Sequence, residues 1–429
     1  MFTSDLIIIG SGPGGYRAAD YAARNGLSVT IIESKQAGGT CLNTGCIPTK
    51  ALAHDANLQK RTWAEAIRRK DEVVEQLAKG VEGLLSQQGI TRVNGHAGFK
   101  DAHTVMVGEA LYTAHNIIIA TGARPALPPI AGSELPHVIT SNQLLSLKEL
   151  PKSLCIIGAG VIGMEFASLL NRFGCKVTVI EYLKECLKNF DNDIAKRVRK
   201  QMERCGIDFH LSCKVTQITE TEVHFEDKRG HENSVKNDLT MISTGRVANL
   251  TDLGLENTGV NFTPKGIIVD GNMQTNIPHI YAIGDCNGRQ LLAHAATFQG
   301  FKAVNSILGK ADHINLNIMP AAVFTNPETA CAGMNMQMAQ EQGLNAQERK
   351  GFYRANGRAV AMEADEGMVK LVTNESDTII GCHACGCHAA DIVQEVACLM
   401  NLGATRTRLA DIVHIHPTIA EVLQDLARQ

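Results

Sequence analysis

The chain has 429 residues, which is more than one ordinary domain holds and suits two to four domains. Hydrophobic residues make up 44% of it and charged residues 20%, an ordinary balance for a globular protein. The formal net charge of -3 argues against a protein that binds nucleic acids or anionic membranes, since such proteins normally show a basic excess.

The chain begins with a short apolar run, residues 6–9, that ends at glycines. This run lacks the basic start and the long apolar stretch of a signal peptide. No other segment approaches the ~20 apolar residues needed to span a bilayer, so we expect a cytoplasmic protein. The 13 cysteines are scattered along the chain, and we expect most of them to be reduced and buried rather than paired.

One sequence unit occurs twice. Residues 6–33 and 154–181 each read as an apolar strand, a GxGxxG turn, a helix, a closing glycine and a second strand that ends in Glu. Gly158 lies 148 positions after Gly10, and the other matching positions keep this offset. Each copy is a complete βαβ dinucleotide-binding fingerprint, in which the glycines admit a pyrophosphate and the final acid accepts hydrogen bonds from ribose. Ordinary glycine turns would account for one such motif more easily than for two.

Further strands that run into turns fit the same plan. Residues 117–124 (IIIATGAR) and 241–246 (MISTGR) each read as a strand that closes a nucleotide unit. Residues 280–286 (IYAIGDC) read as a buried strand that ends in Gly-Asp. Open α/β sheets bind ligands at the carboxyl ends of their strands, so Asp285 is a candidate ligand-binding residue. Taken alone, the Gly-Asp pair indicates only a turn.

Two regions lack the nucleotide fingerprint. The first, residues 54–90, is charged and predicts two helices packed on the core. The second begins near residue 317, with strands expected at 321–324, 367–372 and 378–383 and helices at 390–399 and 407–412. This pattern predicts a separate α+β domain. The apolar residues at helical spacing in the first region are Ala64, Ile67, Val74, Leu77, Val81 and Leu84.

Cys41 and Cys46 lie in GGTCLNTGCIPTK, residues 38–50. In a regular helix two residues five apart are separated by ~7.5 Å along the axis, whereas a disulfide wants Cα atoms ~4.4–6.8 Å apart. A bridge therefore needs a distorted helix start, for which Gly45 and Pro48 are suitable. It would close a very small loop and stabilise little, which favours a redox role. Two buried thiols or two metal ligands are the alternatives.

The motif at 38–50 resembles the active-site motif of the class I pyridine nucleotide-disulfide oxidoreductases, and the chain is most similar to the dihydrolipoamide dehydrogenase family among them. The resemblance runs in order through both fingerprints, the dithiol motif, ATG, GD, LLAH (291–294), PAAVFTNPE (320–328) and HIHPTIAE (414–421). It implies an α/β fold with two Rossmann-like nucleotide-binding domains, for FAD and NAD, and a C-terminal α+β dimerisation domain. The implied divisions are 1–147 and 269–316 for the FAD-binding domain, 148–268 for the NAD-binding domain and 317–429 for the dimerisation domain.

The resemblance also implies roles for the dithiol and its neighbours. Cys46 lies against the flavin and exchanges electrons with it, and Cys41 is the thiol that attacks the substrate disulfide. Lys50 lies near the flavin and pairs with Glu165 of the second fingerprint. This suits the chemistry, because the thiolate is the reactive form and a nearby cation or helix N-terminus stabilises it.

A histidine and a carboxylate complete the implied catalytic set. His416 is the base, contributed by the partner subunit, and Glu421 orients it. Histidine titrates near working pH, and a carboxylate on its far nitrogen fixes the tautomer. The bond from His416 to Pro417 is typically cis in relatives.

The implied cofactors are FAD and NAD. Glu181 favours NAD over NADP, because a carboxylate there bonds the ribose hydroxyls and repels a 2′-phosphate. The residues expected to bind FAD are Gly10, Gly12, Pro13, Gly14, Gly15, Glu33, Gly39, Thr40, Lys50, Ala97, Thr121, Gly122, Asp285, Leu292 and Ala293. Those expected to bind NAD are Gly158, Gly160, Val161, Ile162, Gly163, Glu181, Val215 and Gly245.

The implied reaction is the oxidation of dihydrolipoamide to lipoamide by NAD+, through FAD and a Cys41–Cys46 disulfide. The implied partners are a second copy of the chain and the lipoylated carrier domains of 2-oxo acid dehydrogenase or glycine-cleavage complexes. The alternatives are a related reductase of a small disulfide, a quinone or a metal ion, and a structural flavoprotein with little turnover. The absence of a terminal vicinal cysteine pair counts against mercuric reductase, and Glu181 counts against glutathione reductase.

The chain departs from these relatives at three places. The region 54–62, which helps form the mouth of the disulfide channel, is shorter. Only eight residues follow Glu421, and Ala295 stands where relatives often have Lys. A dense Cys/His set at 382–388 (Cys382, His383, Cys385, Cys387, His388) resembles a metal site, but alternation along a strand would separate Cys382 from His383. We therefore expect an ordinary strand and turn there, and no metal.

Overall fold

The first sequence unit folds into a sheet around β1 (Ser4–Ile9). The structure, a computed structural model, describes residues 3–429. β1 pairs in parallel with β2 (Val29–Glu33) and β6 (Ala110–Ile119), and β6 pairs in parallel with the distant β19 (Ile280–Ala282). The central strands are buried on both faces, which explains their unbroken apolar sequence. The sheet is completed by β3 (Ile90–Asn94), β4 (Ala97–Asp101) and β5 (Thr104–Val107).

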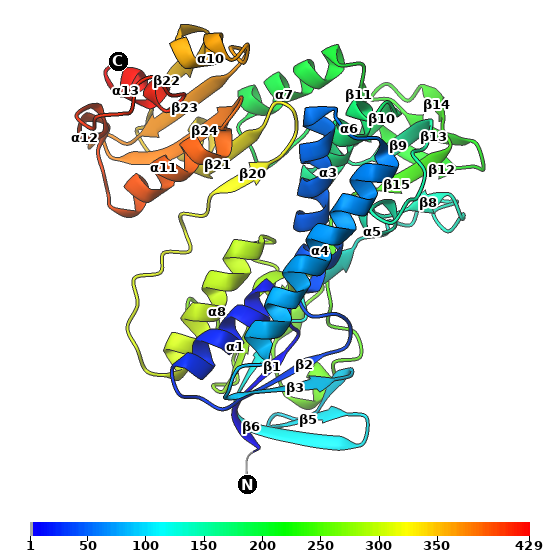
Figure 1. Cartoon of the computed structure of the whole chain (residues 1–429), viewed down its shortest axis with the longest axis vertical. Helices are drawn as coiled ribbons and strands as arrows, with labels where there is room; N and C mark the ends of the chain where they lie inside the picture. Colours follow the sequence, from blue (N-terminus) through cyan, green and yellow to red (C-terminus); the bar gives the residue numbers. More distant parts are fainter. Residues whose placement is uncertain (1–2) are drawn as a thin grey trace.

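Two helices far apart in sequence cover one face of this sheet. α1 (Pro13–Arg24) follows the first glycine-rich turn, and α8 (Ala293–Ile307) follows the Gly-Asp turn after β19. They lie side by side, with Ala18, Ala22 and Ala303 in one buried cluster (Figure 1). The segment 280–307 therefore returns to the first unit after the second has been completed.

The second sequence unit forms a parallel sheet of its own, in the order β11-β10-β9-β15-β8. The glycine-rich turn joins β9 to α6 at the carboxyl end of the sheet. The elements are β8 (Val138–Ile139), α5 (Ser141–Leu144), β9 (Ser153–Ile157), α6 (Val161–Arg172), β10 (Lys176–Glu181), α7 (Asn192–Arg204), β11 (Asp208–Leu211), β15 (Leu239–Ile242), and an antiparallel ribbon of β12 (Lys214–Ile218), β13 (Glu222–Glu226) and β14 (Glu232–Lys236).

The boundaries expected at 148 and 268 stay predictions, and strand pairing supports a different proposal for the limits of the second unit. β8 already pairs with β15 of the second sheet, before residue 148. After β15 the chain returns early: β16 (Arg246–Ala248) pairs with β7 (Ala123–Pro125), and Leu253 and Val260 are buried in the core of the first sheet. We therefore propose β8 and β15 as the limits of the second unit. The returning segment also holds η1 (Leu255–Asn257), β17 (Phe262–Thr263), β18 (Gly266–Ile267) and η2 (Gly284–Asn287).

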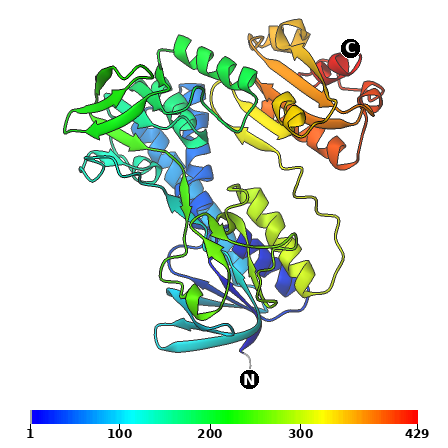
Figure 2. The same cartoon turned by 180° about the vertical axis from the view of Figure 1, so that it is seen from behind.

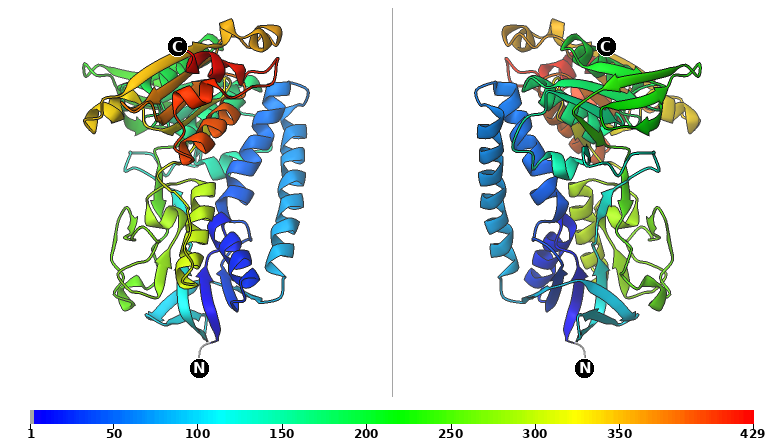
Figure 3. Two further views of the ribbon diagram at one scale, coloured as in Figure 1. Left: turned by 90° about the vertical axis from the view of Figure 1, so that its left-hand side faces the viewer. Right: turned by 90° about the vertical axis from the view of Figure 1, so that its right-hand side faces the viewer.

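The dithiol motif starts a pair of helices that run along the molecule (Figure 3). α2 (Gly39–Thr44) ends at Gly45, whose φ of -144° and ψ of -117° break the helix before α3 (Cys46–Leu58) begins. α4 (Trp63–Leu85) starts with a capping box between Thr62 and Glu65. The two helices confirm the expectation for 54–90, although α3 begins earlier.

The packed face of α4 matches the predicted one only in part. The buried residues are Trp63, Ala66, Lys70, Val81 and Leu85, which include Val81 of the predicted face, whereas Leu77 of that face is 43% exposed. Trp63 sets the register, because its ring packs edge-on against Phe173 at 5.3 Å and its Nε1 donates to the Leu147 carbonyl. A single large aromatic anchor thus decides which side of an otherwise polar helix is buried.

The C-terminal residues form an antiparallel sheet in the order β20-β21-β24-β23-β22, reached through an extended segment after α8 (Figure 2). The three expected strands and two expected helices are present. Sequence reasoning missed β21, β22, α9, α10 and α13. The elements are β20 (Ala321–Val323), β21 (Thr329–Gly333), α9 (Met336–Glu341), β22 (Gln347–Phe352), η3 (Tyr353–Ala355), α10 (Gly357–Ala361), β23 (Met368–Thr373), β24 (Ile379–Cys385), α11 (Ala389–Asn401), α12 (Arg406–Ala410) and α13 (Glu421–Ala427).

The C-terminal sheet is joined to the second unit by a cluster of ion pairs around the buried Lys370. Lys370 on β23, 4% exposed, lies 2.8 Å from Asp191 and 2.9 Å from Asp193 at the start of α7. Glu348 on β22 lies 3.0 Å from the same ammonium, and Lys350 lies 3.0 Å from Asp193. Each charged group therefore lies beside groups of opposite charge, which replace part of the water that it loses on folding.

The Cys/His-rich segment forms the end of β24 and the turn that follows. Cys382 and His383 are both buried, because the strand is covered on its two faces, and His383 Nε2 lies 3.0 Å from the Met334 carbonyl oxygen. Within residues 3–429, no group of three or more His, Cys, Asp and Glu side chains could hold a metal ion. None of the helices formed by these residues combines the length and apolarity that a membrane crossing requires.

Candidate active site

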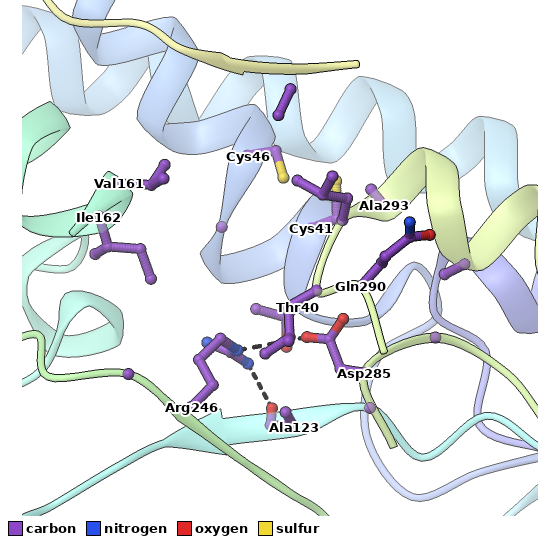
Figure 4. Close-up of a pocket in the computed structure, with 18 of the residues that line it drawn as sticks. Thr40, Cys41, Cys46, Ala123, Val161, Ile162, Arg246, Asp285, Gln290 and Ala293 are labelled. Carbon is purple, nitrogen blue, oxygen red and sulfur yellow. Dashed lines mark hydrogen bonds and ion pairs between the residues drawn. The ribbon is translucent and has the colours of Figure 1, made fainter. Parts of the chain in front are cut away.

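A single cleft of about 2940 Å³ brings together both glycine-rich turns, the dithiol motif and the Gly-Asp turn. Figure 4 shows Cys41 and Cys46 on neighbouring helices at one side of it, with Thr40 and Asp285 below them and Val161 and Ile162 of the second unit across from them. All predicted cofactor-binding residues line this cleft except Gly15 and Gly163, and so do Cys41, Cys46, Lys50 and Glu165. His416 and Glu421 do not line it.

Gly15 and Gly163 serve helix packing instead. A Cβ on Gly15 would stand 1.9 Å from the Gly10 carbonyl oxygen, and one on Gly163 would stand 2.0 Å from the Gly158 carbonyl oxygen. Each third glycine therefore lets its helix approach the preceding turn, as the fingerprint requires. Gly39 approaches the first turn from the dithiol side, where a Cβ would stand 2.6 Å from the Gly12 Cα.

The two acids at the ends of the fingerprints orient the turns in the same way. Glu33 accepts hydrogen bonds from the Ser11 backbone N–H at 2.8 Å and from the Lys35 N–H at 2.9 Å. Glu181 accepts hydrogen bonds from the Ala159 N–H at 2.6 Å and from the Leu183 N–H at 2.8 Å. Each carboxylate thus fixes the turn beside it and lies at the carboxyl end of a strand, where a ribose would bind.

The dithiol consists of two free thiols that interact directly. The hydrogen bond from Cys41, together with the positive charge of Lys50, lowers the pKa of Cys46 to about 7 against its burial. The same hydrogen bond and burial raise the pKa of Cys41. Cys46 is therefore the thiol that carries the negative charge, and Cys41 keeps its proton.

Lys50 and Glu165 form the ion pair expected between the dithiol helix and the second fingerprint helix. Lys50 Nζ lies 2.7 Å from both carboxylate oxygens of Glu165, whose side chain is only 5% exposed. The backbone N–H of Phe324, just after β20, also donates to Glu165, at 2.9 Å, and the Phe324 ring lies 4.9 Å from Lys50 Nζ. One buried carboxylate therefore joins three parts of the chain beside Cys46.

Sequence reasoning found Asp285 but missed its partner, Arg246. Asp285 Oδ2 lies 3.5 Å from Arg246 Nε, and the Arg246 guanidinium also donates to the Ala123 carbonyl (Figure 4). Burial raises the pKa of Asp285, and the charge of Arg246 opposes this effect. Arg246 Nε is buried and has no hydrogen-bond partner among the described residues. A sequence signal was available, because Arg246 directly follows the Thr-Gly turn of the MISTGR segment.

His416 and Glu421 pair with each other in the C-terminal part of the chain, outside the lining of the cleft. His416 Nδ1 lies 2.9 Å from Glu421 Oε1, and the Thr418 backbone N–H donates to the other carboxylate oxygen at 2.9 Å. These contacts, the backbone donor first, lower the pKa of Glu421. The His416 side chain is 81% exposed, so its Nε2 faces outward. The bond from His416 to Pro417 is cis, as expected.

The segment 54–62 does not line the cleft within one chain. The turn between α3 and α4 is short because Gln59 ends α3 in a left-handed conformation and Thr62 caps α4. Fully buried Asp55 is held there by Arg61 at 2.8 Å and by Arg69 at 3.2 Å. The described contacts give this segment a structural role in the single chain.

Comparison with known families covers most of the chain in two parts. Residues 4–300 match the family described as pyridine nucleotide-disulphide oxidoreductase, and residues 319–427 match its dimerisation domain. The chain is 36% identical to the dihydrolipoyl dehydrogenase of Chlamydia muridarum over 446 residues, which cover 99% of this chain and 96% of that protein. It is 35% identical to the dihydrolipoyl dehydrogenase of Bacillus subtilis, with 98% and 97% of the two chains covered.

Among solved structures, the chain is similar to RclA from Escherichia coli, described as a HOCl-induced flavoprotein disulfide reductase. The TM-score is 0.91 and the identity 31%, over 99% of each chain. A Cu(II) complex of RclA matches equally well, with a TM-score of 0.91 over 100% of this chain and 99% of that one. The fold and the order of its parts are therefore shared along the entire chain.

Proposed function

The chain belongs to the pyridine nucleotide-disulphide oxidoreductase family, and from that premise we propose that it oxidises dihydrolipoamide, carried on lipoylated proteins, to lipoamide with NAD+. Membership makes it a flavoprotein disulfide oxidoreductase. The observation that carries the proposal is the dithiol, where Cys46 with a pKa of about 7 adjoins the Lys50–Glu165 pair in one cleft with both glycine-rich turns. The similarity to dihydrolipoyl dehydrogenases over nearly the full chain supports the substrate.

The residues of the cleft fit the two nucleotide cofactors that the family implies. The first turn presents a surface bare of side chains, since Gly12 and Gly39 face each other with no room for a Cβ on Gly39. The buried carboxyl of Asp285 and the Arg246 Nε, which lie 3.5 Å apart without a well-formed hydrogen bond, are polar groups that a bound ligand would satisfy. Bound FAD would supply a two-electron acceptor between the dithiol and the nicotinamide.

We propose NAD rather than NADP as the second nucleotide because of Glu181. Its carboxylate ends β10 beside the second turn and is fixed by two backbone N–H groups. A ribose 2′-hydroxyl can donate a hydrogen bond to such a carboxylate, whereas a 2′-phosphate would meet like charge. No arginine stands at 182 or 183, where a 2′-phosphate would need one.

The chemistry of the dithiol follows from the charge difference between its two sulfurs. In the oxidised state the thiols form a disulfide, and a thiolate of the substrate attacks Cys41 Sγ. The Cys41–Cys46 bond breaks, and Cys46 leaves as the thiolate that its environment stabilises. The second substrate thiol, deprotonated, then attacks the substrate sulfur of the mixed disulfide. The substrate is released with its own disulfide, and Cys41 leaves and takes up a proton.

We propose that His416 accepts and returns these protons. Its Nδ1 is engaged by Glu421, so its Nε2 is the nitrogen free to exchange a proton. Because His416 does not line the cleft of its own chain, the proposal requires that it approach Cys41 of a second copy. The dimerisation domain at 319–427, which contains His416, supports a homodimer.

The test is NAD+ reduction by the purified, FAD-loaded protein with dihydrolipoamide, with NADP+ in parallel. We expect fast NADH formation that is lost in Cys41→Ser and absent with NADP+. Cys205→Ser is the matched control, because Cys205 is an exposed free thiol outside the cleft. Flavin reduction by NADH without turnover of dihydrolipoamide or lipoamide would contradict the substrate and leave the cofactors in place.

A second candidate is a reductase with another acceptor, and the similarity to RclA favours it. RclA is described as a disulfide reductase, and one of its structures is a Cu(II) complex. In this case NADH oxidation would be driven by a small disulfide, a quinone or Cu(II) faster than by lipoamide. A structural flavoprotein with little turnover would oxidise NADH with none of these acceptors.

A further inference from the structure

The loop that carries His416 contains a second histidine in a different environment. Residues 411–418, here called the histidine loop, join α12 to α13 without regular structure. Val413 and Ile415 are 91% and 79% exposed, and the His416 side chain is 81% exposed. The His414 side chain is only 4% exposed. The loop therefore directs His414 inward, whereas Val413, Ile415 and His416 face outward.

Each ring nitrogen of His414 faces an oxygen atom, one of a backbone carbonyl and one of the Glu395 side chain. A carbonyl oxygen can only accept a hydrogen bond, and so can a carboxylate oxygen when the carboxylate is ionised. Nδ1 lies 3.1 Å from the Ile412 carbonyl oxygen, and Nε2 lies 2.9 Å from Glu395 Oε1 on α11. A neutral imidazole has one N–H, whereas an imidazolium has two. The Glu395 side chain is 36% exposed and therefore keeps part of its hydration.

From this geometry we propose that His414 is an imidazolium that acts as a positioning residue for His416. The inference rests on the proposed function, in which His416 exchanges protons with the thiols. Among the loop side chains at 413–416, His414 is bonded to α11, a helix that does not adjoin the loop, whereas His416 is bonded to Glu421 at the start of α13. Glu421, at the start of α13, does not fix the middle of the loop, because its two carboxylate oxygens are bonded to His416 and to the Thr418 N–H.

The charges that face His414 come from two helices. Glu395 approaches from α11, and Glu421 approaches from α13, where the charge of His414 contributes to its lowered pKa after Thr418 and His416. At a pH high enough to remove one proton, His414 can keep only one of its two bonds. The loop is then released either from α11 or from its own internal turn, and His416 loses its fixed position.

The protonation state can be read directly by solid-state ¹⁵N NMR of histidine-labelled, FAD-loaded protein at neutral pH. The chain has 15 histidines, so His414 is identified by subtracting the spectrum of His414→Gln. We expect the difference to contain two protonated nitrogens. His231→Gln is the control, because His231 forms an exposed pair with Asp227 in the β13–β14 ribbon. An unprotonated nitrogen in the His414 difference would overturn the proposal, including the case of a neutral ring beside protonated Glu395.

The positioning role is tested by hydrogen exchange and kinetics in His414→Gln and Glu395→Gln. We expect faster amide exchange confined to 411–418 in both variants and not in His231→Gln. With dihydrolipoamide and NAD+, kcat should fall about ten- to a hundredfold while the KM for NAD+ stays unchanged, as for a misplaced catalytic group. Unchanged exchange in both variants would overturn the role. If the wild-type protein does not oxidise dihydrolipoamide, the proposed function fails, and the exchange and NMR results still decide the state of His414.

Discussion

Replacement of Cys41 by Ala is expected to raise the pKa of Cys46. The hydrogen bond from Cys41 is the largest cause that lowers this pKa to about 7 from an ordinary 9.0, and Lys50 adds to it. Alanine removes the donor, while burial continues to disfavour the thiolate. The chemical consequence is a less reactive flavin-side thiol at neutral pH.

The magnitude follows from the two pKa values. With a pKa of about 7, roughly half of Cys46 is thiolate at pH 7, whereas at 9.0 the fraction would be about 1%. Because Lys50 remains in Cys41→Ala, we expect the midpoint to rise by roughly one to two pH units rather than further. The thiolate fraction at pH 7 should therefore fall by roughly five- to fiftyfold.

The assay is the rate of Cys46 alkylation by iodoacetamide as a function of pH, in reduced protein, with the modified peptide identified by mass spectrometry. Cys41→Ser is the matched control, because serine keeps a hydroxyl donor at the same place. Its midpoint should stay about one to two units below that of Cys41→Ala. Equal midpoints in the two variants would refute the hydrogen-bond explanation and assign the lowered pKa of Cys46 to Lys50. In that case Lys50→Met should raise the Cys46 midpoint.

Three further predictions concern the cofactor turns and the domain junction. Gly39→Ala should weaken FAD binding, measured as FAD retained on dilution, by about 1–3 kcal/mol, because the φ of Gly39 is +59° and the new Cβ would meet Gly12. The control is Gly26→Ala, which should retain FAD because Gly26, at φ +89°, has open space around it. Equal losses of FAD in the two variants would contradict the packing explanation. Glu181→Ala should raise the KM for NAD+ about ten- to a hundredfold, since charged hydrogen bonds are lost; an unchanged KM would remove Glu181 from the site. Lys370 and Lys350 lower the pKa of Asp193 from 3.8 to about 2, so its stabilisation of the folded state is complete above pH 3.8 and is lost as the pH falls toward 2. In Asp193→Asn, the melting temperature should depend less steeply on pH in that window. An unchanged pH dependence would show that the ion-pair cluster does not contribute to stability there.

Much of the site could be predicted because it depends on residues close together in sequence. The two fingerprints fix the glycine positions, the helix starts and the acids at 33 and 181 within about thirty residues, the length of a βαβ unit. The break at Gly45 between Cys41 and Cys46 was likewise expected from local geometry alone. Such features hold because tight turns and close backbone approach admit few residue types.

Other contacts depend on pairings that no local pattern specifies. Arg246 meets Asp285 only because β16 pairs with β7 beside the end of β19, and the Phe324 N–H reaches Glu165 only through the C-terminal sheet. The packed face of α4 was predicted only in part, because it includes Trp63, whose ring packs against Phe173 just after α6. Periodicity gives the direction of each side chain but not the surface that it meets.

By itself, the sequence determined the fold class, the duplicated nucleotide unit and the dithiol, because each has a local motif, while the His416–Glu421 pair was expected from the resemblance to the family. Only the tertiary structure decided which residues join the units, and that the His414 side chain is buried between two acceptors while His416 faces solvent. The reason is physical: burial and charge pairing are set by segments distant in the chain, and they exist only once the segments have packed together.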